Sequence, residues 1–340
     1  MCTFRHLAVL TLVVLTTPST QALDWSFHQP SPHPRLGTDL DFQLAPDGRW
    51  TLAQAEPAVG LWISDDGSDW SFERIDGTSC PGSRPVLDFD GAGEPAILWR
   101  DDEELVLRLS RRLAGTWSTE VVTEVTGPRG GISEFHHDLE FDAAGEPVIA
   151  YTIDGAAGSE ELRLARQDAE GWSSTLLEAG GSKPSLLRRA DGTMVAAWVN
   201  GWSMHFVDDI DLPHVEEIQC CLGTTPPALG ESPDGLLHLG YSGFGGHSNR
   251  AELWERRGEP PTWERTRSED DSSFFTGYRP RLLLRGDSTI LATRAGLLGR
   301  EPGEHLQFTD RALPAGLVFE PSGDLLVLTT DVLPGLPGKP

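Results

Sequence analysis

Seven short apolar runs along the chain each lead into a Gly-bearing turn, which is followed at once by a second apolar run. The turn glycines are Gly48, Gly93, Gly145, Gly192, Gly235, Gly286 and Gly323. Successive glycines are 37 to 52 residues apart, with a mean spacing of about 46. Repeats of roughly 40 to 50 residues built from strand-like segments are typical of β-propellers. The pattern therefore predicts an all-β, seven-bladed β-propeller, with six or eight blades as the alternatives.

Each repeat divides into four predicted strands, as a four-stranded antiparallel blade requires. Two strands flank the Gly turn, and apolar and polar residues alternate in segments such as 147–152. A third strand follows, and in four repeats a fourth strand begins at a Trp: Trp70, Trp117, Trp172 and Trp263. Because these Trp residues recur at one position, we expect them to pack between blades.

The seventh repeat ends near Thr330 and lacks an outer strand of its own. Residues 23–27, which include Trp25, have the character of the missing strand. We therefore expect them to complete the last blade, close the ring and remove an open sheet edge. Residues 23–332 are predicted to form a single propeller domain, and residues 333–340 a Gly/Pro-rich tail.

The first 22 residues have the pattern of an export signal peptide. Arg5 and His6 precede an apolar run at 7–15, and Thr20 and Ala22 occupy the −3 and −1 positions of a cleavage site. This run is too short to span a bilayer, which requires about 20 apolar residues. We expect a secreted or periplasmic protein without a membrane span.

The net charge of −25 restricts the classes of partner. A strongly negative field repels phosphate backbones, so nucleic acid is excluded as an expected partner. The charge also suits solubility in an external medium. Attraction of cations or basic partners is the alternative interpretation.

One segment resembles a known signature. Residues 63–70 read ISDDGSDW, which is similar to the Asp-box of bacterial neuraminidase repeats. Asp65, Gly67 and Trp70 match the box, whereas Ile63 replaces the usual Ser or Thr and Asp69 replaces the usual Thr. In that family the box is a structural turn between the third and fourth strands, away from the active site. The resemblance covers eight residues of one blade and implies a sialidase-like propeller fold rather than a chemistry.

A ligand site is expected on one face of the propeller. That face carries the segments leading into the first strand of each blade and the connections from second to third strands. The candidate ligand-binding residues there are Arg35, Arg84, Arg100, His136, His137, Asp138, Tyr151, Trp202, Tyr241, His247, Tyr278, Arg279 and Arg294. Aromatic and hydrogen-bonding groups on a concave rim suit a sugar or a short polymer. Ordinary solvated loop chemistry is the alternative.

A cation followed by Pro recurs before the first strand at Arg84-Pro85, Lys183-Pro184 and Arg279-Pro280. Three such cations could bind a carboxylate, or they could belong to a repeat consensus in which each cation pairs with a neighbouring acid. The sialidase resemblance implies an Arg triad drawn from Arg35, Arg84, Arg279 and Arg294. It also implies Tyr278 or Tyr241 as nucleophile and Asp138 as acid. The Arg-Ile-Pro motif of that family is absent, with Pro34-Arg35-Leu36 nearest to it, so no catalytic residue is assigned.

Three cysteines remain after the signal segment: Cys80, Cys220 and Cys221. An odd number in an oxidising compartment leaves two arrangements open. A vicinal Cys220–Cys221 disulfide would leave Cys80 unpaired, whereas a bridge from Cys80 to one of the pair would have to reach across the opening. We favour the vicinal disulfide.

No metal site is predicted. Neighbouring His residues on a strand point to opposite faces, so His136 and His137 cannot share one ion without a bulge. No other spacing matches a zinc motif. Carboxylate-rich loops such as residues 99–104 make calcium the one cofactor to consider, although they lack the spacing of an EF-hand.

Together these observations favour a secreted β-propeller that serves as a binding or scaffold module. Its expected partner is carbohydrate or another cell-surface polymer. Two alternatives remain open: a glycan-active enzyme, sialidase-like hydrolase or lyase, using the same face, and a platform for a protein partner.

Overall fold

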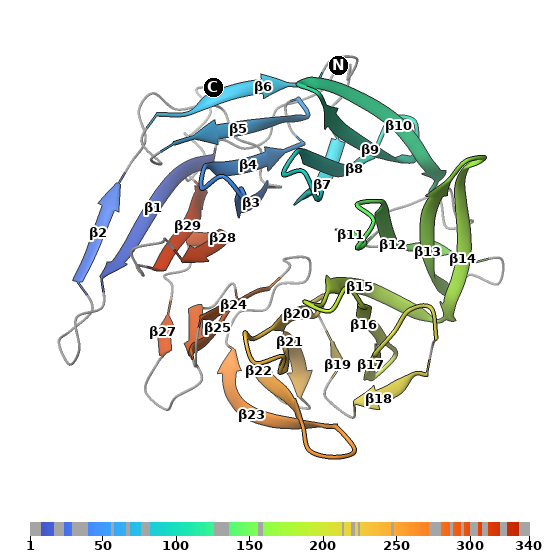
Figure 1. Cartoon of the computed structure of the whole chain (residues 1–340). Coiled ribbons are helices and arrows are strands. Elements are labelled where there is room, and N and C mark those ends of the chain that lie inside the picture. Colours follow the sequence, from blue (N-terminus) through green and yellow to red (C-terminus); the bar gives the residue numbers. More distant parts are fainter. Residues whose placement is uncertain are drawn as a thin grey trace, which may run out of the picture. The chain divides into compact units, whose positions relative to one another are not determined.

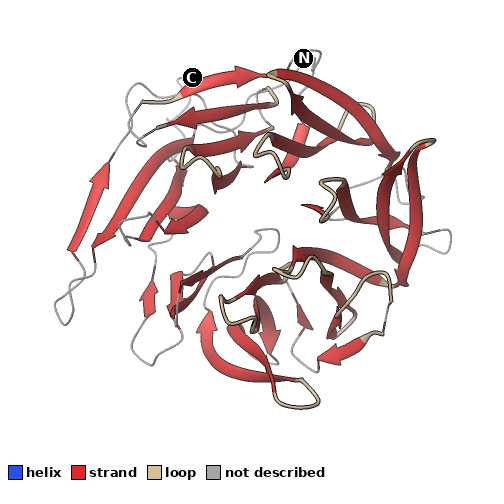
Figure 2. Cartoon of the chain, in the orientation of Figure 1, coloured by secondary structure: helices blue, strands red, loops and turns tan. Residues whose placement is uncertain are grey.

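The structure is a computed structural model. Short strands, in which apolar and polar residues alternate, recur throughout it. It describes residues 8–16, 24–28, 40–55, 58–65, 69–75, 82–125, 136–155, 159–212, 214–218, 222–223, 225–245, 248–271, 280–285, 288–293, 296–299, 305–307, 312–319 and 325–332. These residues form strands, turns and loops, and none of them is helical (Figure 2). The strands make seven sheets, which we number as blades 1 to 7 in the order of their first strands.

Residues 1–89, 93–122 and 308–340 form the first of two compact units, which holds blades 1, 2 and 7. Blade 1 consists of β3 (Leu40–Leu44), β4 (Trp50–Gln54), β5 (Gly60–Ser64) and β6 (Ser71–Arg74). Blade 2 consists of β7 (Gly82–Phe89), β8 (Pro95–Asp101), β9 (Val106–Leu113) and β10 (Thr116–Glu124). Blade 7 consists of β28 (Ala312–Phe319), β29 (Leu325–Val332), β1 (Ala8–Thr16) and β2 (Asp24–His28). Strand β3 contacts both β7 and β28, so the three innermost strands are neighbours (Figure 1).

Residues 90–92 and 123–307 form the second unit, which holds blades 3 to 6. Blade 3 consists of β11 (His137–Phe141), β12 (Pro147–Asp154), β13 (Glu160–Asp168) and β14 (Gly171–Ala179). Blade 4 consists of β15 (Gly181–Arg188), β16 (Met194–Asn200), β17 (Ser203–Val207) and β18 (Glu216–Ile218). Blade 5 consists of β20 (Ala228–Glu231), β21 (Leu237–Gly245), β22 (Ser248–Arg257) and β23 (Thr262–Asp271), with β19 (Leu222–Gly223) also pairing with β21. Blade 6 consists of β24 (Arg281–Arg285), β25 (Ser288–Thr293), β26 (Gly296–Gly299) and β27 (His305–Gln307).

The predicted all-β propeller of antiparallel blades is confirmed, and seven sheets fit the predicted seven blades. The hairpins between first and second strands are as the Gly pattern predicts. Gly48, Gly93, Gly145, Gly192 and Gly235 all have φ between 80° and 90°, a left-handed conformation that favours glycine. In such turns an Asp side chain often accepts the backbone N–H of the residue two positions later, as Asp191 Oδ1 does from Thr193 at 2.9 Å. Gly286 and Gly323 lie outside the described residues.

Blade 7 is completed from the N-terminal part of the chain, as the sequence predicts. Strand β2 is its outermost strand, but it pairs with β1 rather than with β29. Residues 8–16, which the sequence assigns to an export signal, are thus the third strand of blade 7 in the full-length chain. The cleavage of a signal, and the single domain at 23–332, stay predictions.

Large aromatic side chains fill the core at one matching position on the second strands. Trp99, Tyr151, Trp198 and Tyr241 are all essentially inaccessible to solvent. Each polar tip has a partner: Trp99 Nε1 donates to Ser110 Oγ at 3.0 Å, and Trp198 Nε1 donates to Glu178. Burial of each ring stabilises the fold by about 1.5 to 3 kcal/mol. The Trp residues that start the fourth strands are only half-buried, as at Trp117, Trp172 and Trp263.

Among the described residues, no helix is long and apolar enough to cross a membrane.

Candidate functional site

Five residues that the sequence places in a ligand site are buried in the structure. They are His136, His137, Asp138, Tyr151 and Tyr241. The Tyr241 hydroxyl donates to Glu252 Oε2 at 2.7 Å, and the Tyr151 hydroxyl lies 2.6 Å from Ser174 Oγ. All five side chains are therefore largely shielded from solvent, and the hydroxyls of Tyr151 and Tyr241 bond within their own blades, while the assignment of these residues to a ligand site stays a prediction.

Asp138 connects the innermost strands of blades 3 and 4. Its Oδ2 atom accepts the backbone N–H of Leu186 at 2.6 Å, and its Oδ1 atom accepts that of Leu139 at 2.9 Å. Asp41 makes the equivalent connection from blade 1 to the N–H of Leu87 in blade 2, at 2.9 Å. Because each carboxylate accepts a backbone N–H of the next blade, both Asp side chains join neighbouring blades.

Glu140 lies two residues beyond Asp138, and therefore on the same face of β11. Burial, and next the negative charge of Asp138, raises the pKa of Glu140 to about 7, while Arg188 on β15 partly opposes the rise. Glu140 thus exchanges a proton near neutral pH. Glu140 is not among the site residues predicted from the sequence, although an acid inside an apolar first strand is a visible signal.

Two of the cations that the sequence places just before a first strand lie inside that strand instead. Arg84 and Lys183 lie within β7 and β15, at bulges where the register with the second strand shifts, rather than before those strands. Both have left-handed backbones, with φ of 53° and 56°. Arg100 forms an ion pair with Asp102, at 2.9 Å between Nε and Oδ1.

Several predicted site residues lie outside the described residues. They are Arg35, His247, Tyr278, Arg279, Arg294 and the cysteines Cys80, Cys220 and Cys221. The three-cation ring and the vicinal disulfide therefore stay predictions. Trp202 is described, and its side chain is 70% exposed on the turn between β16 and β17. It is an accessible aromatic group, and its place in a ligand site stays a prediction.

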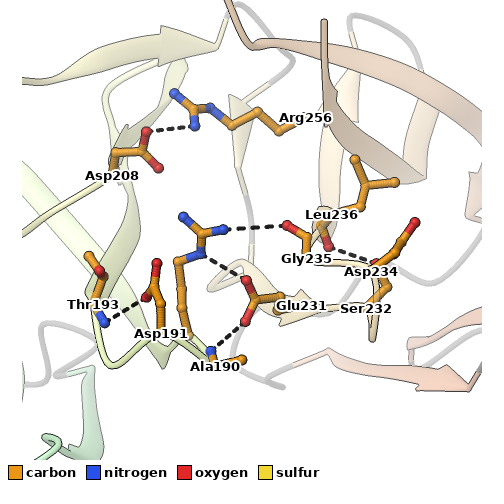
Figure 3. Close-up of polar contacts among 11 residues, drawn as sticks. Ala190, Asp191, Thr193, Asp208, Glu231, Ser232, Asp234, Gly235, Leu236 and Arg256 are labelled. Carbon is orange, nitrogen blue, oxygen red and sulfur yellow. Dashed lines mark hydrogen bonds and ion pairs between the residues drawn. The ribbon is translucent and has the colours of Figure 1, made fainter.

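A polar cluster joins blades 4 and 5 at the ends where the first and second strands meet. Glu231 accepts a bond from Arg189 Nε at 2.9 Å and from the backbone N–H of Ala190 at 2.6 Å (Figure 3). Farther out, Arg256 bonds to Asp208 at 2.6 Å and to Glu216 at 2.5 Å. Because Arg189 and Arg256 each pair with carboxylates of the neighbouring blade, we interpret this cluster as a structural connection between blades 4 and 5.

A pocket lies at one end of blade 1, and all of its described residues belong to that blade. Its volume is about 330 Å³, and its lining is Arg49, Ile63, Ser64, Asp65, Asp69, Trp70 and Ser71. The β3–β4 turn supplies Arg49, and the end of β5, the connection after it and the start of β6 supply the others. Pockets of roughly 300 to 1,000 Å³ with an apolar wall and a few polar groups are typical of small-ligand sites.

The pocket coincides with the segment that resembles an Asp-box, and it lies at the opposite end of the strands from the predicted face. Antiparallel pairing of β3 to β6 brings the first turn and the last connection of the blade together at this end. The Ser71 hydroxyl donates to the carbonyl of Ile63 at 3.3 Å, which ties β6 to β5 beside the pocket. Trp70 is half-buried, whereas Asp65 and Asp69 are exposed.

Arg49 is paired within its own turn. Its Nε atom lies 2.7 Å from Asp47 Oδ2, and its backbone N–H donates to Asp47 Oδ1 at 3.1 Å. Burial raises the pKa of Asp47, but hydrogen bonds from the backbone and side chain of Arg49 outweigh it, and the pKa is lowered overall. Asp47 therefore remains an anion at neutral pH and neutralises the cation of Arg49.

Within the described part of the chain, no group of three or more His, Cys, Asp or Glu residues could hold a metal ion. Calcium, the cofactor considered from the sequence, has no such ligand group among these residues. A calcium site elsewhere in the chain stays untested.

No family model and no curated protein matches the chain. Solved structures do resemble it. A putative 6-phosphogluconolactonase from Bacteroides uniformis has a TM-score of 0.52 at 14% identity, over 89% of this chain and 96% of that one. The SapL1 lectin in complex with alpha methyl fucoside has a TM-score of 0.51 at 10% identity, over 88% and 98%. A protein of unknown function from Dyadobacter fermentans has a TM-score of 0.50 at 12% identity, over 86% and 94%. At these identities the likeness extends to the fold alone.

Proposed function

We propose that this protein is a carbohydrate-binding β-propeller and that the pocket at the end of blade 1 is a sugar site. The observation that carries this proposal is the composition of the pocket wall. One Trp, two Asp and two Ser residues line one concavity of about 330 Å³, together with Arg49 and Ile63. A pyranose has an apolar face of C–H groups, which packs on an indole, and a rim of hydroxyls, which donate to carboxylates.

The fold is compatible with this function. The SapL1 lectin, which has a similar fold, was solved in complex with a fucoside. Because one fold hosts many unrelated functions, that likeness supports the proposal only as a precedent. The pocket residues of this chain carry the argument, and the neighbour's ligand is not transferred to it.

Binding of the labelled full-length protein to a glycan array tests the proposal. We expect at least one class of oligosaccharide to bind. We also expect Trp70→Ala to weaken that binding about tenfold or more, because it removes an apolar surface worth about 1.5 kcal/mol or more. Trp172→Ala is the matched control, since Trp172 starts the fourth strand of blade 3, is half-buried and does not line the pocket.

The proposal fails if no glycan binds, or if Trp70→Ala and Trp172→Ala reduce binding equally. Equal loss would indicate that both variants act through general destabilisation of the blades.

A glycan-active enzyme is the second candidate, and one observation favours it. Glu140 has a pKa of about 7 and shares a strand face with the buried Asp138. A carboxyl group whose pKa is raised to near neutral is suited to act as a general acid. Release of product from labelled oligosaccharides, absent in Glu140→Gln, would support this candidate, and turnover that is unchanged in Glu140→Gln would exclude Glu140 from it.

A further inference from the structure

Two carboxylates are paired on blade 3, at the end where β12 passes into β13. Asp154, the last residue of β12, is the register partner of Glu160, the first residue of β13. The next pair along is hydrogen-bonded, because the N–H of Gly155 donates to the carbonyl of Ser159 at 2.7 Å. Since the two kinds of pair alternate along an antiparallel ladder, Asp154 and Glu160 form a non-hydrogen-bonded pair, in which the facing side chains lie closer together.

Like charges directly opposite each other destabilise a strand pair unless a cation offsets them. Arg163 on β13 does not do so, because it lies on the other face of the strand and pairs with Glu161 at 3.4 Å. The Oδ1 atom of Asp154 is almost inaccessible to solvent and has no hydrogen-bond partner. This carboxylate oxygen is therefore oriented to accept a ligand.

Thr152 provides a second and independent observation. It precedes Asp154 by two residues on β12, and side chains two residues apart on a strand lie on the same face. Thr152 is only 3% exposed, and its hydroxyl has no hydrogen-bond partner. A polar group buried in this way indicates that an ion or a water molecule supplies the missing contact.

The face that carries these side chains packs on blade 4. Val148 and Ala150 precede Thr152 on this face, and they belong to one apolar cluster with Leu186 and Trp198 of blade 4. The three oxygen-bearing side chains therefore lie at the end of a packed contact between two blades. A ligand bound there is held by groups of blade 3 whose backbone positions are fixed by strand pairing.

We propose that Asp154, Glu160 and Thr152 form a binding site for a calcium ion. All three offer oxygen atoms, which calcium prefers as ligands, and two carboxylates match its double positive charge. Two acids are fewer than the groups of three considered above, so water completes the coordination of about six to eight oxygens that calcium takes. The inference goes beyond the sugar site, because none of these residues lines the blade 1 pocket.

Calorimetric titration of the full-length, chelator-treated protein with calcium chloride tests the inference. The buffer contains about 0.15 M sodium chloride, which screens the general attraction of a chain of net charge −25 for any cation. We expect one calcium ion to bind per chain, with a Kd of about 0.1 to 1 mM because the site has few charged ligands. Magnesium chloride should bind about tenfold more weakly, because magnesium requires a stricter geometry and gives up its water less readily.

Variants of the proposed ligands locate the ion. Asp154→Asn and Glu160→Gln should each weaken calcium binding about tenfold or more, because each removes a charged ligand. Thr152→Val keeps the shape of the side chain and should weaken binding about threefold. Glu161→Gln is the matched control, because it makes the same charge change on the other face of β13, and its affinity should stay within about twofold of wild type. Melting temperatures without calcium show whether each variant is folded.

Several outcomes would overturn the inference. Absence of saturable calcium binding would leave water as the partner of the Thr152 hydroxyl. Equal losses in Glu160→Gln and Glu161→Gln would identify a general attraction of cations to an acidic chain. Binding that is unchanged in Thr152→Val, or magnesium that binds as tightly as calcium, would also contradict the proposed site. Glycan binding is measured separately, so each of these results leaves the proposed function standing.

Discussion

The Oδ2 atom of Asp138 accepts the backbone N–H of Leu186 at 2.6 Å, which joins the innermost strand of blade 3 to that of blade 4. Blades 1 and 2 are joined in the same way through Asp41 and the N–H of Leu87. Each Asp is almost completely buried, at 1% and 2% exposure. Charged groups this deeply buried are retained in folded proteins only where they are paired or hydrogen-bonded.

Replacement of these acids should destabilise the protein. Asp138→Ala leaves the buried N–H of Leu186 without its acceptor, so we expect a loss of about 1 to 3 kcal/mol in the free energy of unfolding. Asp41→Ala should cost a similar amount. Urea unfolding followed by Trp fluorescence measures both values. A loss below about 0.5 kcal/mol for both variants would contradict the role of these bonds.

Glu140 should make stability depend on pH. Its pKa is raised from 4.5 to about 7 in the folded protein, first by burial and then by Asp138. The folded state therefore binds more protons than the unfolded state between these values, and stability falls as the pH rises through about 7. The expected fall from pH 4.5 to pH 8 is on the order of 3 kcal/mol for this one group.

Glu140→Gln should remove that component of the pH dependence, because the amide does not titrate. Unfolding free energies of both proteins across this pH range measure it. Glu146→Gln is the control, since Glu146 is exposed beside the same hairpin. An identical pH profile for wild type and Glu140→Gln would contradict the raised pKa.

Replacement of Arg256 by a neutral residue or by Lys should destabilise the protein. Its side chain is 8% exposed and bonds to Asp208 through one nitrogen (Figure 3). The other nitrogen bonds to Glu216. Arg256→Met removes the cation from two partly exposed carboxylates, with an expected cost of about 1 to 2 kcal/mol. Arg256→Lys should also destabilise, because an ammonium cannot reproduce the two-pronged geometry.

Arg166→Lys provides the comparison for thermal denaturation. Arg166 pairs with Asp211 at 2.7 Å, but both side chains are largely exposed, so the substitution should be close to neutral. If Arg256→Lys lowers the melting temperature as little as Arg166→Lys does, the ion pairs between blades 4 and 5 contribute little to stability.

The N-terminal segment gives a prediction about processing. If residues 1–22 are an export signal, the exported protein begins at Leu23, and N-terminal sequencing will find that residue. Such a chain lacks β1, which pairs with β29 from Leu15 and Leu325 to Ala8 and Val332. Amide exchange across β29 should then be faster than in the uncleaved chain. A secreted protein that begins at Met1 would contradict the signal assignment.

Much of the fold could be predicted because it depends on local pattern. The turns at Gly48 and Gly192 are each signalled by the residues next to them in the sequence, and the start of a fourth strand by a single Trp. The apolar run at residues 8–16 is different, since an export signal and a buried strand share the same pattern. Only its pairing with β29 distinguishes the strand.

The site was harder to predict, because burial and partnership depend on other blades. Tyr241 appears in the sequence as an available hydroxyl, yet its partner Glu252 lies on the next strand and both are buried. Asp138 looks like a rim acid until its bond to Leu186, 48 residues away, is known. The pocket lies at the segment that resembles an Asp-box, but that resemblance predicted a structural turn and not a ligand site, and Arg49 joins the pocket only through the pairing of β3 to β6.

Titration of the indole N–H resonances with an oligosaccharide that binds on the glycan array tests the central claim most directly. The resonance of Trp70 is assigned by its disappearance in Trp70→Phe, and those of Trp172 and Trp202 in the same way. A sugar site at the end of blade 1 predicts a saturable shift of the Trp70 resonance, with Trp172 and Trp202 unchanged. A shift at Trp202 with Trp70 unchanged would place binding at the opposite end of the blades and contradict this account.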